Sequence, residues 1–514
     1  MPEKATNILL ISSDQQHYST LGSVNDRIQT PALDRLAAEG VRFDRAYCPN
    51  PTCTPTRASF ITGTYPSQHG AWSLGTKLFE TVPVLGDWLQ QAGYATSLVG
   101  KAHWQPLASQ PGFESLECQP TLRDLDFWRR FRGPWYGFEH IDVARMHGDE
   151  SHAGQHYAIW MEERGLADWK DYFQPWPPQP KKKGGRAHYW EAEDRHWKLP
   201  QEFHYTAWTA ERTIARIEQA AAADRPFFAF ASFHDPHPPY VVPEPWASMY
   251  DPGDMVPGVL TPGEHDKNPI HFRLTQDPDA RKKLYDLFFE DHGIHGFDCH
   301  VRDPETIRKD MAVYYGMVSF MDREIGRILD RLDQLALAEN TLVVFTTDHG
   351  HFLGQHGLVA KGPFHYEDVI RVPLIVRWPG RVPAGKISTD IQNTVDFAPT
   401  FLAAAGLEVP GIMTGLNVLP NWCGKEPVRT WSITENRHTF KNVHLRTYVD
   451  QRYKLTVYRA GGDGELFDLQ QDPDEVNNLW HEFAAAELKA RLLHDFLQAT
   501  MTYEPTPMPR IAGA

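Results

Sequence analysis

Asn7-Ile8-Leu9-Leu10-Ile11-Ser12-Ser13 is the stretch of sequence that decides the fold class. Its short apolar run is typical of a strand in the middle of a sheet, buried on both faces. Further strands are predicted at 41–47, 95–99, 226–232 and 341–347. Helices are expected from Pro31 to just before Gly40 and over 85–91. This alternation of strands and helices predicts an α/β sandwich with a large, mostly parallel central sheet flanked by helices.

Charged residues follow three of these predicted strands. Asp14 directly follows the first strand, Lys101 follows the strand at 95–99, and Asp348 follows the strand at 341–347. In open α/β sheets, ligands bind beyond the carboxyl ends of the strands. We therefore expect these three residues to meet at one edge of the sheet.

The sequence Cys53-Thr54-Pro55-Thr56-Arg57 carries the strongest chemical signal. Thr54 and Pro55 are typical of a helix start, and Gly63 can end that helix. Cys53 is then expected just outside the helix N-terminus, where free N–H groups and the helix dipole favour negative charge. A cysteine taken alone would more often be a buried structural residue.

The Cys-x-Pro-x-Arg pattern resembles the core motif of the type I, formylglycine-dependent sulfatases of the alkaline phosphatase superfamily. In that family the cysteine is oxidised to formylglycine, and the hydrate of this aldehyde is the nucleophile. Other matching segments occur in the same order over most of residues 7–400. The resemblance implies an alkaline-phosphatase-like fold and the hydrolysis of sulfate monoesters, close to bacterial arylsulfatases and phosphonate monoester hydrolases.

The same resemblance implies a site for one divalent metal ion. Its ligands would be Asp14, Gln15, Asp348, His349 and the modified Cys53. The family usually has a second aspartate where this chain has Gln15, which keeps an oxygen ligand and removes one charge. Ca²⁺ is the usual ion of the family, whereas an imidazole ligand suits Mn²⁺ better. Both ions remain open.

Five further residues are assigned to the site by the resemblance. Gly100-Lys101-Ala102-His103 is similar to the family's G-K-W-H segment: Lys101 would bind a substrate oxygen and the nucleophile, and His103 would orient the hydrated aldehyde and later remove its second proton. His237 matches the family's P-H-x-P strand end. Lys361 matches the lysine that contacts the leaving group, and Arg57 would hold the formylglycine in place.

Two other functions stay open. Phosphonate monoester and phosphodiester hydrolases of the same superfamily also use formylglycine and can carry the Asp-Gln and Asp-His metal pairs. Lys101 and His103 instead keep the sulfatase pattern, which favours sulfate esters. If Cys53 were never oxidised, the protein would be a catalytically silent anion-binding protein.

The chain of 514 residues is long for a single core, which predicts two domains. A catalytic domain is expected over 1–425, with insertions at about 105–200 and 250–310 that cover the sheet edge. A smaller α+β domain with an antiparallel sheet is expected over 426–514, ending in a tail that could reach a neighbouring subunit of a homo-oligomer.

Composition restricts the partners and the compartment. The net charge of −15 speaks against nucleic acid and requires local attraction of a small anionic ester substrate. Five cysteines at irregular spacing indicate a reducing compartment. The first apolar run is too short for a secretory signal, and no run has the length of a membrane span. We expect a cytoplasmic protein, without membrane contact, that is matured by a formylglycine-generating enzyme.

Overall fold

The structure, a computed structural model, describes residues 5–175, 195–288, 296–438, 443–459 and 461–508. Its centre is a nine-stranded sheet with the order β10-β2-β9-β6-β1-β5-β3-β4, in which β11 also pairs with β2. The strands are β1 (Asn7–Ser13), β2 (Val41–Tyr47), β3 (Ala95–Gly100), β4 (His140–Val143), β5 (Phe227–Ser232), β6 (Thr341–Thr347), β9 (Arg371–Arg377), β10 (Lys386–Ser388) and β11 (Gln392–Asn393). Adjacent strands run parallel except at β9, which is antiparallel to β2 and β6. The predicted mostly parallel sheet is confirmed.

β1 lies in the interior of this sheet, between β5 and β6. Ile8 pairs with Phe228 on one side and with Leu342 on the other. Because successive side chains point to opposite faces, Ile8 joins the hydrophobic core on one face and Leu9 joins the core on the other. A strand buried on both faces explains why the stretch reads as an unbroken apolar run.

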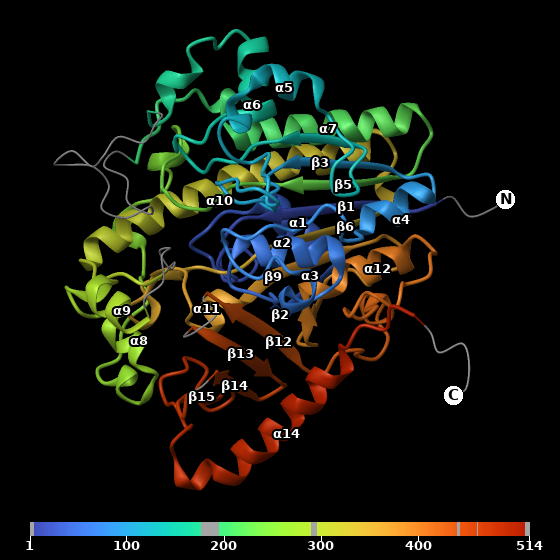
Figure 1. The fold of residues 1–514 in the computed structure, drawn as a ribbon. Helices are drawn as coiled ribbons and strands as arrows, with labels where there is room; N and C mark the ends of the chain where they lie inside the picture. The colour runs from blue at the N-terminus through green and yellow to red at the C-terminus, as the bar shows by residue number, and fades with distance from the viewer. Residues whose placement is uncertain (1–4, 176–194, 289–295, 439–442, 460, 509–514) are drawn as a thin grey trace.

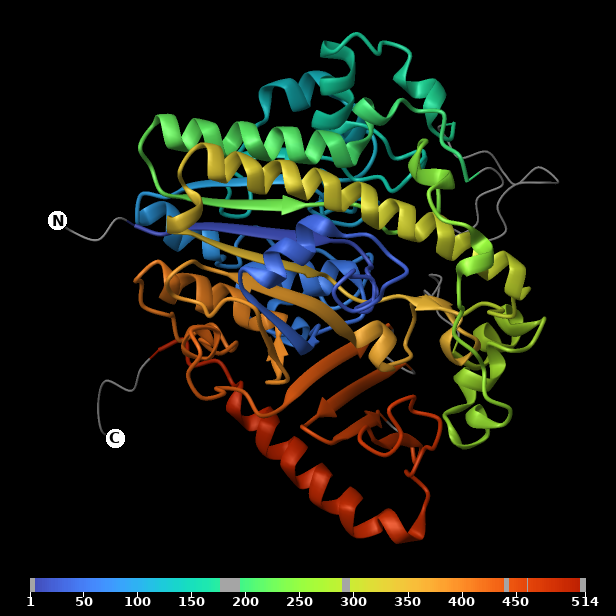
Figure 2. The same cartoon turned by 180° about the vertical axis from the view of Figure 1, so that it is seen from behind.

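Helices cover both faces of the sheet (Figures 1 and 2). One face is covered by α1 (Pro31–Ala38), α7 (Tyr205–Ala222) and α10 (Pro304–Gln334), and the other by α2 (Cys53–Thr62), α4 (Leu85–Gln91) and α12 (Phe397–Ala404). The long helices α7 and α10 lie side by side in both views. Shorter elements connect these layers: α3 (Pro66–His69), α5 (Leu125–Arg130), α6 (Gln155–Glu163), α8 (Ile270–Leu274), α9 (Ala280–Phe288), α11 (Glu367–Ile370), α13 (Leu419–Trp422), β7 (Phe352–Leu353) and β8 (Val359–Ala360).

A second, antiparallel sheet lies below the central sheet in the view of Figure 1. It consists of β12 (Ser432–Arg437), β13 (His444–Val449), β14 (Tyr453–Tyr458) and β15 (Gly464–Asp468), with α14 (Ala486–Thr502) packed against it. β12 is tied to the segment before Cys53, because the Glu435 N–H donates to Pro49 O and Thr434 Oγ1 donates to Cys48 O. The second sheet therefore helps to hold the segment that leads into α2.

Two local expectations differ from the structure. α2 begins at Cys53 rather than at Pro55, so Cys53 is the first helical residue instead of lying outside the helix. Thr52 is extended and ends the preceding loop, and Pro55 occupies a position in the first turn where its missing N–H costs no hydrogen bond. The expected insertion at 105–200 contributes β4, a four-residue strand of the central sheet itself.

The structure describes the expected insertions and the tail only in part. Residues 176–194 and 289–295 lie outside the described residues, as does the end of the tail from residue 509. Within the described tail, the Thr506 N–H donates to Gly411 O of the same chain. The domain boundary at 425 stays a prediction. Within the described ranges, no helix combines the length and the apolar character that crossing a membrane requires.

Candidate active site

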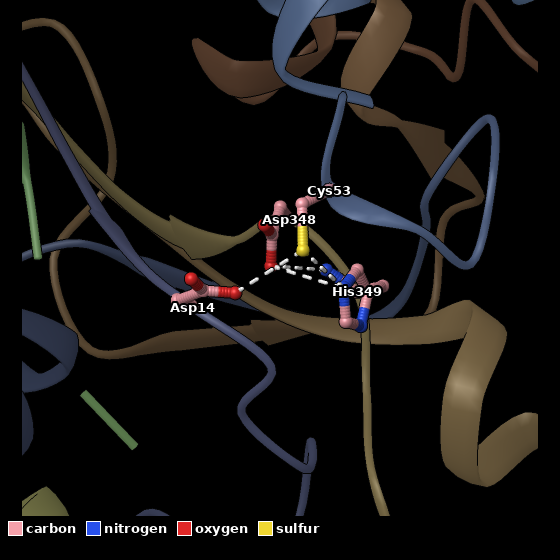
Figure 3. A group of neighbouring side chains, drawn as sticks. All are labelled: Asp14, Cys53, Asp348 and His349. Carbon is pink, nitrogen blue, oxygen red and sulfur yellow. Dashed lines mark hydrogen bonds and ion pairs between the residues drawn. The ribbon is translucent and has the colours of Figure 1, made fainter. Parts of the chain in front are cut away.

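The carboxyl ends of β1, β3 and β6 bring the expected residues together. Asp14 follows β1, Lys101 follows β3, and Asp348 and His349 follow β6. Figure 3 shows Asp14, Asp348 and His349 directed toward Cys53 at the start of α2. All four side chains are buried, and so is that of Lys101. Residues from four distant parts of the sequence thus form one buried polar cluster.

Cys53 is the point on which the cluster converges. Its Sγ lies 3.6 Å from Asp14 Oδ1, 3.2 Å from His349 Nε2 and 3.1 Å from Lys361 Nζ. Burial, and then the charge of Asp14, raise the pKa of the thiol. Residue 53 is the unmodified cysteine here, so Sγ occupies the position that the oxygens of formylglycine would take.

Asp14, Cys53, Asp348 and His349 place their ligand atoms within 4.8 Å of one another, which is close enough to share one metal ion. His349 Nδ1 lies 3.0 Å from Gly350 O, a contact in which the ring nitrogen must donate. The Nε2 lone pair therefore faces Cys53. Burial lowers the pKa of His349 to about 4, so its ring is neutral and able to bind a metal.

Gln15 is a further candidate ligand, through its amide oxygen. Its backbone has a φ of 61°, a left-handed conformation that is uncommon for a residue other than glycine. Its Nε2 is 2.8 Å from His351 Nδ1, while its buried Oε1 has no hydrogen-bond partner among the described residues. A buried oxygen that lacks a donor fits a divalent cation, as do the two carboxylates and the imidazole.

Arg57 contacts Asp348, one of the candidate metal ligands. Arg57 Nε donates to Asp348 Oδ2 at 2.8 Å, and one terminal nitrogen donates to Ser232 Oγ at 2.6 Å. The other Asp348 oxygen accepts the N–H groups of Gln15 and His349, each at 2.9 Å. These contacts position Asp348, and the role in holding formylglycine that the resemblance implies for Arg57 stays a prediction.

Lys101 lies between Asp14 and a histidine that sequence reasoning missed. Its Nζ forms an ion pair with Asp14 and is 2.7 Å from His147 Nε2. His147 Nδ1 is 3.1 Å from Glu150, and its ring stacks on His237 with centroids 3.7 Å apart. Although burial alone would raise it, the charge of Lys101 keeps the pKa of Asp14 well below its ordinary value. His147 belongs to the expected insertion and matches no motif, so no sequence signal indicated it.

Lys361 and His237 lie beside His349 at residue 53. Lys361 Nζ is 3.3 Å from both His237 Nε2 and His349 Nε2. His237 Nδ1 donates to Pro238 O, so its Nε2 is the acceptor that faces Lys361. Burial, and then the neighbouring positive charges, hold the pKa of His237 well below its ordinary value. The pair can therefore offer the N–H groups of Lys361 to a bound anion, while the neutral imidazole of His237 accepts from Lys361 and holds it in place.

His103 is buried near this cluster, and its closest polar contact is outside the expected set. Its Nε2 is 2.7 Å from a terminal nitrogen of Arg145, and its φ is 59°. The ring centroids of His103 and His147 are 6.3 Å apart. His234, which matches no motif position, lies 3.0 Å from Ala144 O. The structure therefore brings every expected site residue to one region, together with the unexpected His147 and Arg145.

The chain is similar to known proteins in sequence and in structure. The sulfatase family model matches residues 6–407, and a model of the C-terminal part of N-sulphoglucosamine sulphohydrolase matches residues 354–502. The chain is 27% identical to an uncharacterized sulfatase of Escherichia coli, over 96% of this chain and 86% of that one. It is 27% identical to an arylsulfatase of Clostridium perfringens, over 97% and 94%. A solved phosphonate monoester hydrolase from Silicibacter pomeroyi superposes with a TM-score of 0.76 at 26% identity, over 98% of this chain and 96% of the other.

Proposed function

The chain belongs to the sulfatase family, within the alkaline phosphatase superfamily. On that basis we propose that it hydrolyses sulfate monoesters as an arylsulfatase-like enzyme. The observation that carries the proposal is the convergence of Asp14, His349 and Lys361 on residue 53. A nucleophile at this position would have both candidate metal ligands and a cationic donor within contact distance. Formylglycine derived from Cys53 is the proposed nucleophile.

A divalent cation would be held by Asp14, Gln15, Asp348 and His349, together with residue 53. When bound, it would lower the pKa of the attacking oxygen and stabilise charge on the transferred group. Three oxygen-bearing side chains favour Ca²⁺, while the imidazole of His349 favours Mn²⁺. A competition experiment with Ca²⁺ and Mn²⁺ would show which of the two ions the site binds more tightly.

Two buried lysines of the site, Lys101 and Lys361, supply the positive charge for a tetrahedral anion. Lys101 is fixed by Asp14 and His147, and Lys361 is fixed by His237. Donors that are already in place where negative charge develops usually give the largest catalytic contribution. Lys361, with His237 behind it, is the proposed donor to the departing ester oxygen.

Hydrolysis of phosphonate monoesters or phosphate diesters is the second candidate. The Asp14-Gln15 and Asp348-His349 pairs and the structural similarity to a phosphonate monoester hydrolase favour it. Lys101 and His103 favour the sulfatase. Comparing kcat/KM for p-nitrophenyl sulfate and p-nitrophenyl phenylphosphonate separates the two, because the better substrate must show the higher value.

The burial of Cys53 limits when a formylglycine-generating enzyme can modify it. Cys53 is fully buried in the folded chain, so a formylglycine-generating enzyme has to act before folding is complete. Among the described residues the five cysteines are free thiols, in keeping with the proposed cytoplasmic location.

The decisive experiment is a mass spectrum of the tryptic peptide 46–57 after denaturation and alkylation. The peptide also contains Cys48, a second buried cysteine that must alkylate and so serves as an internal control. An aldehyde at residue 53 in protein from its native cell supports the proposal. Complete alkylation of Cys53 in that protein would overturn it and leave the anion-binding protein as the better account.

A further inference from the structure

A buried chain of side chains leads from His103 to Arg145 and Glu117. Arg145 places a terminal nitrogen 2.7 Å from His103 Nε2 and its Nε 3.1 Å from Glu117 Oε2. The three residues expose only 7%, 6% and 1% of their surface, in the same order. Arg145 and Glu117 lie in the expected insertion, and no sequence motif includes them.

The contact with Arg145 fixes which ring nitrogen of His103 carries hydrogen. A guanidinium has only N–H donors, so the Nε2 that it contacts must present its lone pair. A neutral imidazole has one N–H, which then has to be on Nδ1. Burial, and then the charge of Arg145, hold the pKa of His103 well below its ordinary value, so the neutral ring is the form present near pH 7.

We infer that His103 serves the site as a fixed N–H donor through Nδ1, held in this tautomer by Arg145, and not as a base. Nδ1 is buried and has no hydrogen-bond partner among the described residues. A buried donor without an acceptor is costly unless a ligand supplies one. The acceptor that fits is an oxygen of the anionic ester or of the modified residue 53, and this part of the inference rests on the proposed function.

Glu117 fixes the same histidine from the backbone side. Its Oε1 accepts the N–H of Trp104, the residue after His103, at 3.1 Å. His103 itself has a φ of 59°, a left-handed conformation that is strained for a residue other than glycine and persists only where the surroundings hold it. Arg145 therefore sets the proton position of the ring, while Glu117 holds both Arg145 and the adjoining peptide.

The neighbouring histidines also carry hydrogen on Nδ1, but they turn the other ring nitrogen toward the site residues. His147, His237 and His349 direct Nε2 lone pairs toward Lys101, Lys361 and Cys53. With His103 supplying an N–H, the site combines acceptors that hold the lysines with a donor for an anion. The proton that the family resemblance would give to His103 cannot be accepted there, because Arg145 occupies the lone pair at Nε2.

The first test is independent of catalysis. Protein labelled with ¹⁵N in histidine is compared with the His103→Asn variant to assign the His103 signals. We expect a neutral ring with hydrogen on Nδ1 and no titration between about pH 5.5 and 8.5. Hydrogen on Nε2, or titration in that range, would overturn the inference. In Arg145→Met, which removes the donors, the Nδ1–H form should lose its dominance; Arg145→Lys, which retains a donor, should keep it.

The second test is kinetic. Asparagine places an amide N–H close to the position of Nδ1 but is no base, whereas aspartate in its place is an acceptor. If His103 is a donor, His103→Ala should lose about 10²–10³-fold in kcat/KM, and His103→Asn should retain at least ~10-fold more activity than His103→Asp. Equal activities of the Asn and Asp variants, or a more active Asp variant, would reject the donor role. Inactivity of the unsubstituted enzyme on every ester would refute the proposed function instead, and the tautomer would still be read from the spectrum.

Discussion

Lys361 Nζ lies 3.1 Å from Cys53 Sγ, although 308 residues separate the two in the sequence. The same ammonium group is 3.3 Å from His237 and from His349. A flexible lysine with this many fixed partners has lost most of its conformational freedom before any substrate binds. This preorganisation leads to the first prediction.

Replacing Lys361 by methionine should lower kcat/KM by about 10²–10³-fold, because it removes a preorganised donor next to the nucleophile. Lys361→Arg keeps the charge and should lose less. Steady-state kinetics on an aryl sulfate measures the effect, and mass spectra of peptide 46–57 show whether residue 53 is modified equally in all variants. Unchanged kcat/KM in the methionine variant would remove Lys361 from the mechanism.

Removing the metal should abolish activity and lower thermal stability together. A chelator followed by Ca²⁺ or Mn²⁺ should restore both, and an ion at one hundred times its Kd adds about 2.7 kcal/mol to the free energy of unfolding. Gln15→Ala removes the buried Oε1 and should weaken this metal-dependent rise in stability. Thermal unfolding with increasing metal concentration makes the measurement. An identical rise in wild type and variant would exclude Gln15 as a ligand.

Breaking the ion pair between Arg57 and Asp348 should destabilise the fold strongly. Both side chains are fully buried and lie 2.8 Å apart, so Arg57→Met leaves a buried carboxylate without its partner at a cost of about 3–5 kcal/mol. Adding Asp348→Asn removes that charge and should recover part of the loss. Urea unfolding of the single and double variants tests this coupling, and purely additive effects would show that the pair does not act as a unit.

His356 should make stability depend on pH in the mildly alkaline range. Burial alone would lower its pKa, but hydrogen bonds to Asp368 and Glu264 raise it to about 9 from an ordinary value of 6.5. Between these values the folded protein binds more protons than the unfolded chain, so the contribution of His356 is complete below pH 6.5 and is lost as pH rises through about 9.

The matched variant for this prediction is His356→Gln, which cannot become charged. The free energy of unfolding of wild type should exceed that of the variant most at about pH 6, and the difference should shrink toward about pH 9.5. Other groups around the ring, including Tyr366 stacked at 3.6 Å, are the same in both proteins. A difference that stays constant over this range would mean that His356 is not protonated in the folded state.

Several parts of the site could be predicted from sequence because each depends on local pattern. Asp14, Lys101 and Asp348 follow apolar strands, and the carboxyl ends of neighbouring strands meet at one edge. Their juxtaposition therefore followed from the α/β alternation. His147 and Arg145 escaped prediction because they follow the short strand β4, which has too few residues to show a pattern, in a segment that matches no motif.

The sequence by itself determined the fold class, since continuous apolar runs of strand length that alternate with helices are typical of strands covered on both faces. It also determined which residue types could perform the chemistry at the sheet edge. Tertiary structure alone decided that α2 begins at Cys53, that Arg57 holds Asp348, and which nitrogen of His103 carries its proton. These properties depend on contacts between side chains far apart in the chain, and the distance and direction of such contacts are set only when the layers pack.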